Sequence, residues 1–293
     1  MRAAGVDRIG AAVRLLKLPE PGPPGDGEVL IEVRACGIGN WDEITRAGGW
    51  DIGTRPPMAL GVEAAGTVAA VGAGVRGFAV GDAVTTHALP GGSWAERFMA
   101  AAEYVAPVPA GLSLAAAGAL PVPALTADQA LDAAAVGVGQ TVLVHGAGGV
   151  TGGVLVRLAA ARGARVIATA GHPDRIRALG AEQVLDYREP DWPERVQVDA
   201  VVNAARSGSA DAIRAVRDGG RLATITSDLP ATERGITLAD VVVVPDGARL
   251  GRLAALLAPD VITVGASYPL EEAAAAMARV RQGTHGAAIV LTP

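Results

Sequence analysis

A glycine-rich turn between two apolar runs is the first stretch whose residue types suit a chemical role. Residues 141–170 have the sequence TVLVHGAGGVTGGVLVRLAAARGARVIATA, with apolar runs at 141–145 and 165–169 and a helical pattern from 150 to 162. Strand, tight turn, helix and strand within about 30 residues make one βαβ unit. Glycines let the backbone approach a pyrophosphate, and a helix N-terminus offers free N–H groups. The stretch therefore predicts the first half of a dinucleotide-binding fold.

The sequence after this stretch continues to alternate between strands and helices. Apolar, β-branched runs predict further strands at 183–186, 198–203, 220–226 and 240–244. Helical patterns lie between and after them, at 173–179, 208–217 and 246–257. This alternation is typical of a parallel, doubly wound Rossmann sheet, which belongs to the α/β class.

The first 110 residues have a different pattern. Residues 28–36 alternate, with Val29, Ile31 and Val33 on one face. The segment 61–72 predicts a strand with glycine interruptions, which often mark bulges in small barrels. We expect an irregular, mostly antiparallel barrel, then alanine-rich helices within 113–135. The tail predicts a helix at 270–281 and a last strand at 287–291.

Composition excludes several classes of protein. A formal net charge of −5 and a pI near 5.4 argue against binding nucleic acid through a basic surface. No uninterrupted apolar run is long enough to span a membrane, and the first ten residues lack a signal-peptide core, so we expect a cytoplasmic protein. The single cysteine, Cys36, excludes an intrachain disulfide and a multi-thiolate zinc site, and suits a buried small side chain.

Several motifs resemble the medium-chain dehydrogenase/reductase superfamily, in particular its zinc-free quinone oxidoreductase branch. They are GVEAAGTVAAVGAGVRGFAVGDAV (61–84), SWAERF (93–98), AGALPVPALTA (117–127), GQTVLVHGAGGVTG (139–152) and LGAEQVLDYRE (179–189). The resemblance implies a GroES-like substrate domain at 1–114, completed by 261–293, and a Rossmann NADP-binding domain at 115–260. It also implies a homodimer.

The same resemblance predicts no metal site. Zinc enzymes of the superfamily carry a cysteine and a histidine where this chain has Gly39 and Val62. Neither residue can ligate zinc, which needs several N or S ligands at set spacing.

The end of the second predicted Rossmann strand bears on the choice of cofactor. NAD enzymes usually place a carboxylate there to bind the ribose diol, whereas this chain has Ala170, Gly171 and His172. Arg175 and Tyr187 follow at places where the quinone reductase branch contacts a 2′-phosphate, which favours NADPH. Alternatively, Arg175 is only a solvated residue in the first turn of a helix. The predicted cofactor-binding residues are Gly146, Gly148, Gly149, Val150, Thr151, Ala170, Gly171, His172, Arg175, Tyr187, Ala204 and Val243.

The resemblance implies hydride transfer from NADPH to a small apolar quinone or enone. The candidate catalytic residues are Asn40, Asp42, Trp50 and Thr126. Asn40 either hydrogen-bonds a substrate carbonyl or is a turn residue. Asp42 either orients water or a ribose hydroxyl, or caps a helix, and Thr126 either lies beside the nicotinamide or starts a helix. Some enoyl reductases of the family have a proton-donating tyrosine soon after this segment, where this chain has Gly48, Gly49 and Trp50. Trp50 is expected to form an apolar wall of the substrate site.

Three further polar residues are expected to have structural roles. His145 ends the first Rossmann strand, and Glu63 belongs to the superfamily's G-x-E signature, where a hydrogen-bonding role is expected. His87 is expected in a surface loop, with a general-acid role as the alternative. Two other functions stay open on this fold: a biosynthetic tailoring enzyme, acting by ene reduction or cyclisation of a polyketide-like substrate, and a non-catalytic NADPH-binding sensor.

Overall fold

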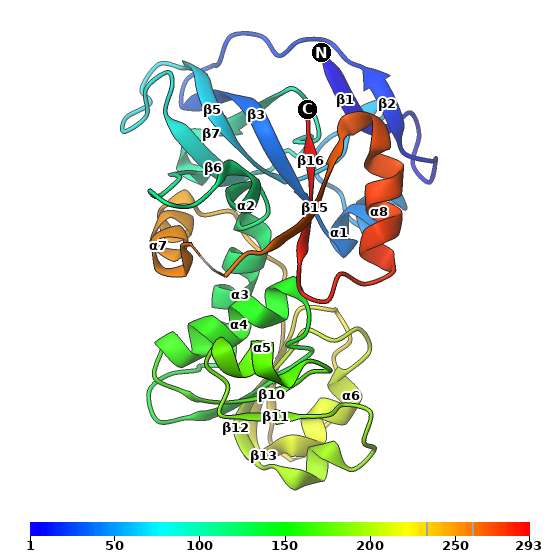
Figure 1. The fold of residues 1–293 in the computed structure, drawn as a ribbon, viewed down its shortest axis with the longest axis vertical. Helices are drawn as coiled ribbons and strands as arrows, with labels where there is room; N and C mark the ends of the chain where they lie inside the picture. The colour runs from blue at the N-terminus through cyan, green and yellow to red at the C-terminus, as the bar shows by residue number, and fades with distance from the viewer. Residues whose placement is uncertain (233, 260) are drawn as a thin grey trace. The chain divides into compact units, whose positions relative to one another are not determined.

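The computed structural model describes residues 1–232, 234–259 and 261–293. The chain forms two compact units (Figure 1). The first consists of Met1–Val122 and Pro245–Pro293, and the second of Pro123–Val244. These limits differ from the sequence-based limits at 114 and 260, because helix α7 (Gly247–Leu257) packs on the first unit. A Cβ on Gly247 would lie 2.5 Å from the carbonyl oxygen of Val105, so the helix starts in close contact with strand β8.

The first unit contains two sheets. The smaller is antiparallel, in the order β2 (Arg14–Lys17), β1 (Arg2–Val6), β4 (Met58–Ala59). The larger has the order β15 (Val264–Pro269), β16 (Ala288–Thr292), β3 (Glu28–Ile38), β5 (Glu63–Val71), β6 (Ala83–His87), β8 (Val105–Pro107), with β7 (Arg97–Ala101) paired to β3. Among the described residues of this sheet, β15 and β16 are the one parallel pair, and the other pairs are antiparallel. The predicted antiparallel β unit, completed by a strand from the tail, is confirmed.

Apolar alternation explains how β3 sits in this unit. Val29, Ile31 and Val33 are buried, whereas Glu32 and Arg34 point to solvent. The helices of the unit are α1 (Asn40–Arg46), α2 (Leu114–Gly118), α7 and α8 (Ala273–Arg281), with short 3₁₀ turns η1 (Ala102–Tyr104) and η4 (Leu270–Glu272). Helix α8 packs beside β2, which ties the tail of the chain to its beginning (Figure 1).

The second unit is a parallel sheet covered by helices, as the sequence predicts. Its order is β11 (Gln183–Leu185), β10 (Arg165–Thr169), β9 (Thr141–His145), β12 (Val198–Asn203), β13 (Val216–Thr224), β14 (Thr237–Asp240). The helices are α4 (Val150–Ala161), α5 (Pro173–Ala178) and α6 (Ser209–Ala212), with 3₁₀ turns η2 (Trp192–Arg195) and η3 (Ile213–Ala215). Helix α3 (Pro121–Ala133) begins in the first unit and continues into the second. Within the described residues, no helix has the length and apolar character needed to cross a membrane.

The order of the strands reverses between β9 and β12. Strands β10 and β11 follow β9 on one side, and β12, β13 and β14 continue on the other, all in parallel. Ligands of doubly wound sheets bind outside the carboxyl ends of the strands at this reversal. The topology therefore predicts that the residues that follow β9 and β12 belong to the ligand site.

Two predicted elements differ from those observed, and one observed strand has no predicted counterpart. The strand predicted at 240–244 ends at Asp240, so Val243 lies in an irregular segment after β14. The helix predicted at 208–217 is only α6 and η3, because Val216 already pairs with Val198 in the sheet. Strand β15 was not predicted from the sequence. Its side chains alternate only between half-buried and exposed, which leaves no apolar pattern.

Candidate functional site

The glycine turn between β9 and α4 is the centre of the candidate cofactor site. Gly146 has a φ of +85°, in the left-handed region that glycine adopts without cost, and a Cβ there would lie 2.7 Å from the backbone nitrogen of Ala205. A Cβ on Gly152 would lie 2.2 Å from the carbonyl oxygen of Gly146. The turn is therefore pressed between α4 and the loop after β12, and larger residues at these two positions do not fit.

The other side of the turn is open. A Cβ added to Gly148 would meet no heavy atom within 4 Å, and one on Gly149 would make only an ordinary contact of 3.8 Å. Gly149 is the N-cap of α4, and Val150 and Thr151 form its half-exposed first turn. Free N–H groups at the start of a twelve-residue helix, beside open space, suit a pyrophosphate.

Thr169, the last residue of β10, fixes the turn from the side. Its hydroxyl oxygen accepts a hydrogen bond from the backbone N–H of Gly146 (3.0 Å) and lies 2.7 Å from Nδ1 of His145. The His145 ring stacks on Trp192 with 4.8 Å between ring centroids, and burial lowers its pKa. The structural role predicted for His145 is confirmed.

The residues after β10 have no carboxylate at the ribose position. Ala170 is buried, whereas Gly171 and His172 are exposed. A Cβ on Gly171 would lie 4.0 Å from the exposed ring of Tyr187, so these two predicted contacts are neighbours.

Arg175 is not an ordinary solvated residue of the first turn of α5. Its side chain is half-buried, and its Nη2 lies 3.1 Å from where a Cβ on Gly153 would stand. The guanidinium therefore lies against α4, the helix that follows the glycine turn. Burial lowers its pKa. Asp174 receives a hydrogen bond from Arg177 at 3.1 Å.

Two other predicted cofactor residues follow strands on the far side of the reversal. The backbone N–H of Ala204 donates to the carbonyl oxygen of His145 (2.8 Å), which joins the ends of β12 and β9. Val243 lies beyond β14, two strands away in the sheet order from β12. The structure brings Ala204 to the glycine turn, whereas Val243 lies after the edge strand of the sheet.

Three of the four candidate catalytic residues belong to α1 and the loop after it. Asn40 is exposed at the first position of α1, and Trp50 is half-buried in the loop. Asp42 is buried, and its Oδ2 accepts a hydrogen bond from the backbone N–H of Gly39 (2.8 Å). Gly39 is the N-cap residue of α1, so Asp42 caps the N-terminus of this helix. Burial raises its pKa to about 8, which the bond from Gly39 opposes. Thr126, the fourth candidate, is buried on α3 in the second unit.

The indole ring of Trp41 fills the volume beside Gly39. A Cβ on Gly39 would lie 2.3 Å from two atoms of that ring, so a side chain at the zinc-ligand position of related enzymes would require the Trp41 ring to move. Among the described residues, no three His, Cys, Asp or Glu side chains are grouped in a way that suits a metal ion. Cys36 is fully buried, as predicted, and its thiol donates to the carbonyl oxygen of Ser93 (3.0 Å).

Glu63 connects the barrel to the start of α3. Its Oε2 accepts a hydrogen bond from the backbone N–H of Val122 (2.7 Å), which confirms its predicted hydrogen-bonding role. Burial raises the pKa of Glu63 well above its usual range.

His87 was expected in a surface loop, and this prediction is wrong. It ends β6 and is completely buried, because β6 extends further than its turn signals indicated. Its Nδ1 lies 3.0 Å from the carbonyl oxygen of Val62, and since a carbonyl only accepts, Nδ1 carries the proton. Its buried Nε2 has no hydrogen-bond partner among the described residues. Burial lowers the pKa of His87.

Sequence reasoning missed a polar network at the ends of β12 and β13. Asn203, Ser209 and Thr224 are fully buried and bond with Thr226 and Asp228. Their spacing follows no recognisable motif. The one indication in the sequence is that Thr224, Thr226 and Ser227 lie at the end of a parallel strand.

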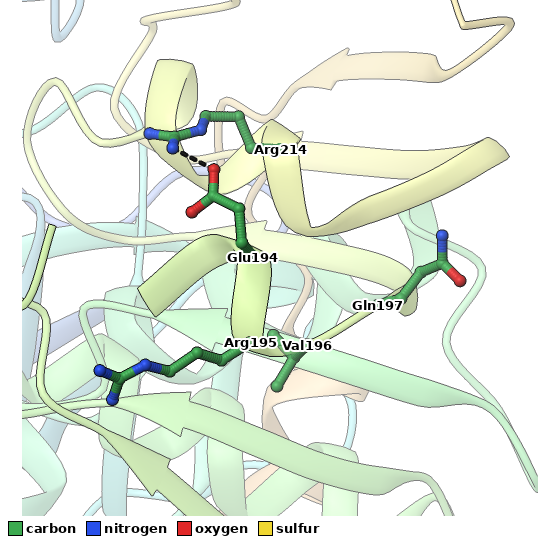
Figure 2. A pocket seen from close by; sticks show the side chains of 5 residues that line it. All are labelled: Glu194, Arg195, Val196, Gln197 and Arg214. Atoms are coloured by element: carbon green, nitrogen blue, oxygen red, sulfur yellow. Dashed lines mark hydrogen bonds and ion pairs between the residues drawn. The ribbon is translucent and has the colours of Figure 1, made fainter. Parts of the chain in front are cut away.

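A shallow pocket of about 480 Å³ lies elsewhere on the second unit (Figure 2). Its lining residues are Glu194, Arg195, Val196, Gln197 and Arg214. Arg214 pairs with Glu194, and Arg195 pairs with Asp191 at 3.0 Å. None of the predicted site residues lines it, and its arginines are already paired.

Comparisons with known proteins agree with this architecture. Residues 25–110 match the alcohol dehydrogenase GroES-like domain family, and residues 179–291 match the zinc-binding dehydrogenase family. A quinone oxidoreductase from Sus scrofa is 32% identical over 219 residues, covering 71% of this chain and 67% of that protein. Matches to five other mammalian quinone oxidoreductases cover 54–65% of their length, so the chain spans about two thirds of these relatives or less.

Two further similarities are to part of a polyketide synthase and to a protein solved with a bound nucleotide. A mycocerosic acid synthase-like polyketide synthase from Mycobacterium tuberculosis is 36% identical over 182 residues, covering 60% of this chain and 8% of that protein. A mycobacterial protein solved in complex with NADPH has a TM-score of 0.84 and 29% identity, with both chains fully covered. The chain belongs to the medium-chain dehydrogenase/reductase superfamily, in its quinone oxidoreductase-like branch.

Proposed function

We propose that this protein is an NADPH-dependent oxidoreductase that reduces a quinone or an α,β-unsaturated carbonyl compound without zinc. The observation that carries the proposal is the open face of the glycine turn at Gly148 and Gly149, with Arg175 against the same helix and no carboxylate at Ala170. NADPH supplies the hydride when it is bound.

The fit of these residues to the cofactor rests on charge and space. The N-terminal turn of α4 at Val150 and Thr151 presents N–H groups to the pyrophosphate. Arg175 offers a guanidinium fork to the 2′-phosphate. His172 lies three residues before it, and Tyr187 lies beside Gly171. A carboxylate at position 170 would repel that phosphate, and Ala170 does not.

The residues proposed to act on the substrate hold and orient it. Asn40 is exposed at the start of α1 and offers an amide N–H to a substrate carbonyl oxygen, where negative charge develops. Trp50 shapes an apolar wall, and Thr126 contributes a hydroxyl from α3. Trp41 supports the zinc-free assignment, because its ring stands where a ligand at position 39 would need space.

Steady-state oxidation of NADPH with a panel of quinones and enones tests the proposal. We expect turnover that survives prolonged dialysis against EDTA, because no zinc takes part. NADPH binding with no reduction of any acceptor would favour a non-catalytic NADPH-binding sensor instead. Activity that disappears with EDTA and returns with Zn²⁺ would refute the zinc-free mechanism.

A second candidate function is ene reduction or cyclisation of a polyketide-like substrate on the same fold. The similarity to part of a polyketide synthase favours it. Acyl thioesters with a 2,3-double bond, added to the same assay, discriminate the two: preference for them over quinones by kcat/KM supports the tailoring enzyme.

We also propose that the protein forms a homodimer through its second unit. Strand β14 is the last strand of the six-stranded sheet, and Val242 and Val244 just after it are exposed apolar residues. Light scattering coupled to size-exclusion chromatography measures the mass, and a monomer at micromolar concentration would contradict this proposal.

A further inference from the structure

Asp228 accepts hydrogen bonds from three separate segments of the second unit. Its carboxylate accepts from the hydroxyl groups of Thr224 (2.6 Å), Ser209 (2.7 Å) and Thr226 (2.8 Å). It also accepts from the backbone N–H of Ser209 (3.0 Å) and from the side-chain nitrogen of Asn203 (3.2 Å). These donors come from the end of β12, the start of α6 and the end of β13, so one carboxylate joins all three.

The groups that donate hydrogen bonds to Asp228 are all neutral, and its charge acts to raise the pKa of His145, which burial lowers. Partial burial acts to raise the pKa of Asp228, but the hydrogen bonds from Thr224, Ser209 and Thr226 outweigh burial and lower the pKa to about 2. In the part of the chain that the structure describes, no arginine, lysine or histidine forms an ion pair with Asp228. A negative charge with no ion-pair partner among the described residues therefore lies just after β13.

The network holds the loop at 204–208 against the glycine turn. The side-chain oxygen of Asn203 accepts from the N–H of Ala205 (3.0 Å), and Ala205 is the residue that a Cβ on Gly146 would strike. Ser207 and Ser227 have φ angles of 57° and 51°, a region that residues other than glycine rarely adopt. Such conformations persist where the surroundings fix them, and they cluster at ligand sites.

The position of Asp228 in the sheet indicates which part of a dinucleotide it would face. The glycine turn and the ribose position after β10 belong to the first half of the fold, which takes the adenosine side. Asn203 and Thr224 end β12 and β13, which belong to the second half, across the reversal of strand order. The second half takes the nicotinamide nucleotide.

We propose that Asp228 sets the preference of this site for the redox form of the cofactor, by favouring the cationic nicotinamide of NADP⁺ over the neutral ring of NADPH. This inference rests on the proposed function, since it assumes that the site binds NADP(H). The oxidised ring carries one positive charge that the reduced ring lacks, and a nearby carboxylate attracts only the charged form. The hydroxyl groups of Ser209, Thr224 and Thr226 keep the carboxylate in place and ionised.

Dissociation constants for NADP⁺ and NADPH, measured by titration calorimetry on the full chain, test the inference. We expect D228N to weaken NADP⁺ relative to NADPH by about threefold or more, because a Coulomb attraction is lost for one form only. D228S removes the same charge with a different side chain and is used if D228N does not fold. T226V removes a hydroxyl that hydrogen-bonds Asp228, Asn203 and Thr224 but keeps the charge of Asp228. D211N removes an exposed charge from α6. Both variants should leave the ratio unchanged.

The outcomes separate this inference from the function on which it rests. If wild-type protein binds neither nucleotide, the proposed function fails and the inference fails with it. If wild-type protein binds both and the ratio is unchanged in D228N and D228S, the inference alone is overturned. Equal weakening of NADP⁺ and NADPH binding in D228N and T226V would mean that Asp228 only shapes the loop. That outcome also overturns the inference.

Discussion

At the scale of single residues, the proposed preference for NADPH depends on Arg175. Its guanidinium lies against Gly153 on α4. We expect it to bind a 2′-phosphate that lies near Gly171 and Tyr187. We expect R175A to raise the Kd for NADPH about tenfold, since a charge-assisted hydrogen bond is lost, with little change for NADH. Fluorescence titration with both nucleotides gives the two constants.

Arg177 provides the matched control for this substitution. It lies on the same short helix, is exposed, and donates to Asp174. R177A should leave both nucleotides unaffected, which separates a specific contact from a general loss of positive charge. Equal weakening of NADPH and NADH by R175A would rule out the 2′-phosphate assignment.

At the scale of elements, the turn between β9 and α4 combines a closed side with an open side. Gly152 faces the closed side, so G152A forces a methyl group towards the carbonyl oxygen of Gly146 and should lower the melting temperature by several degrees. Gly148 faces open space, so G148A should leave the melting temperature unchanged but weaken NADPH binding. Thermal denaturation and titration of both variants check this, and NADPH binding that is unaffected by G148A would argue against a pyrophosphate on the open side.

The elements that could be predicted from the sequence are those with a local pattern. The turn, α4 and the neighbouring strands follow from glycine spacing and apolar periodicity, and they lie within one or two residues of their predicted limits. Neither the ring of Trp41 over Gly39 nor the burial of His87 has such a pattern, because both depend on how distant segments pack. The donors to Asp228 are separated by whole elements of the sheet, so only the folded chain brings them together.

At the scale of the whole molecule, buried ionisable groups in both units make stability depend on pH with opposite signs. His87 and His145 have lowered pKa values, so the unfolded chain binds more protons below about pH 6.5 and stability falls there. Asp42 and Glu63 have raised pKa values, so the folded chain keeps protons that the unfolded chain has lost above about pH 4. Their contribution is complete at low pH and is lost as pH rises through their folded pKa values.

Between about pH 7.5 and 8 the two histidines are neutral in both states, whereas Asp42 keeps a proton that the unfolded chain has lost, so the two effects separate there. We expect the melting temperature of the wild-type protein to fall across this window and that of D42N to fall less steeply, because the amide has no proton to lose and still accepts from the N–H of Gly39. D51N, at an exposed carboxylate that pairs with Arg55, should keep the wild-type slope. Differential scanning calorimetry at several pH values measures these slopes. Parallel curves for wild type and D42N would mean that Asp42 is already ionised in the folded protein, and its burial would then need a partner that balances the charge.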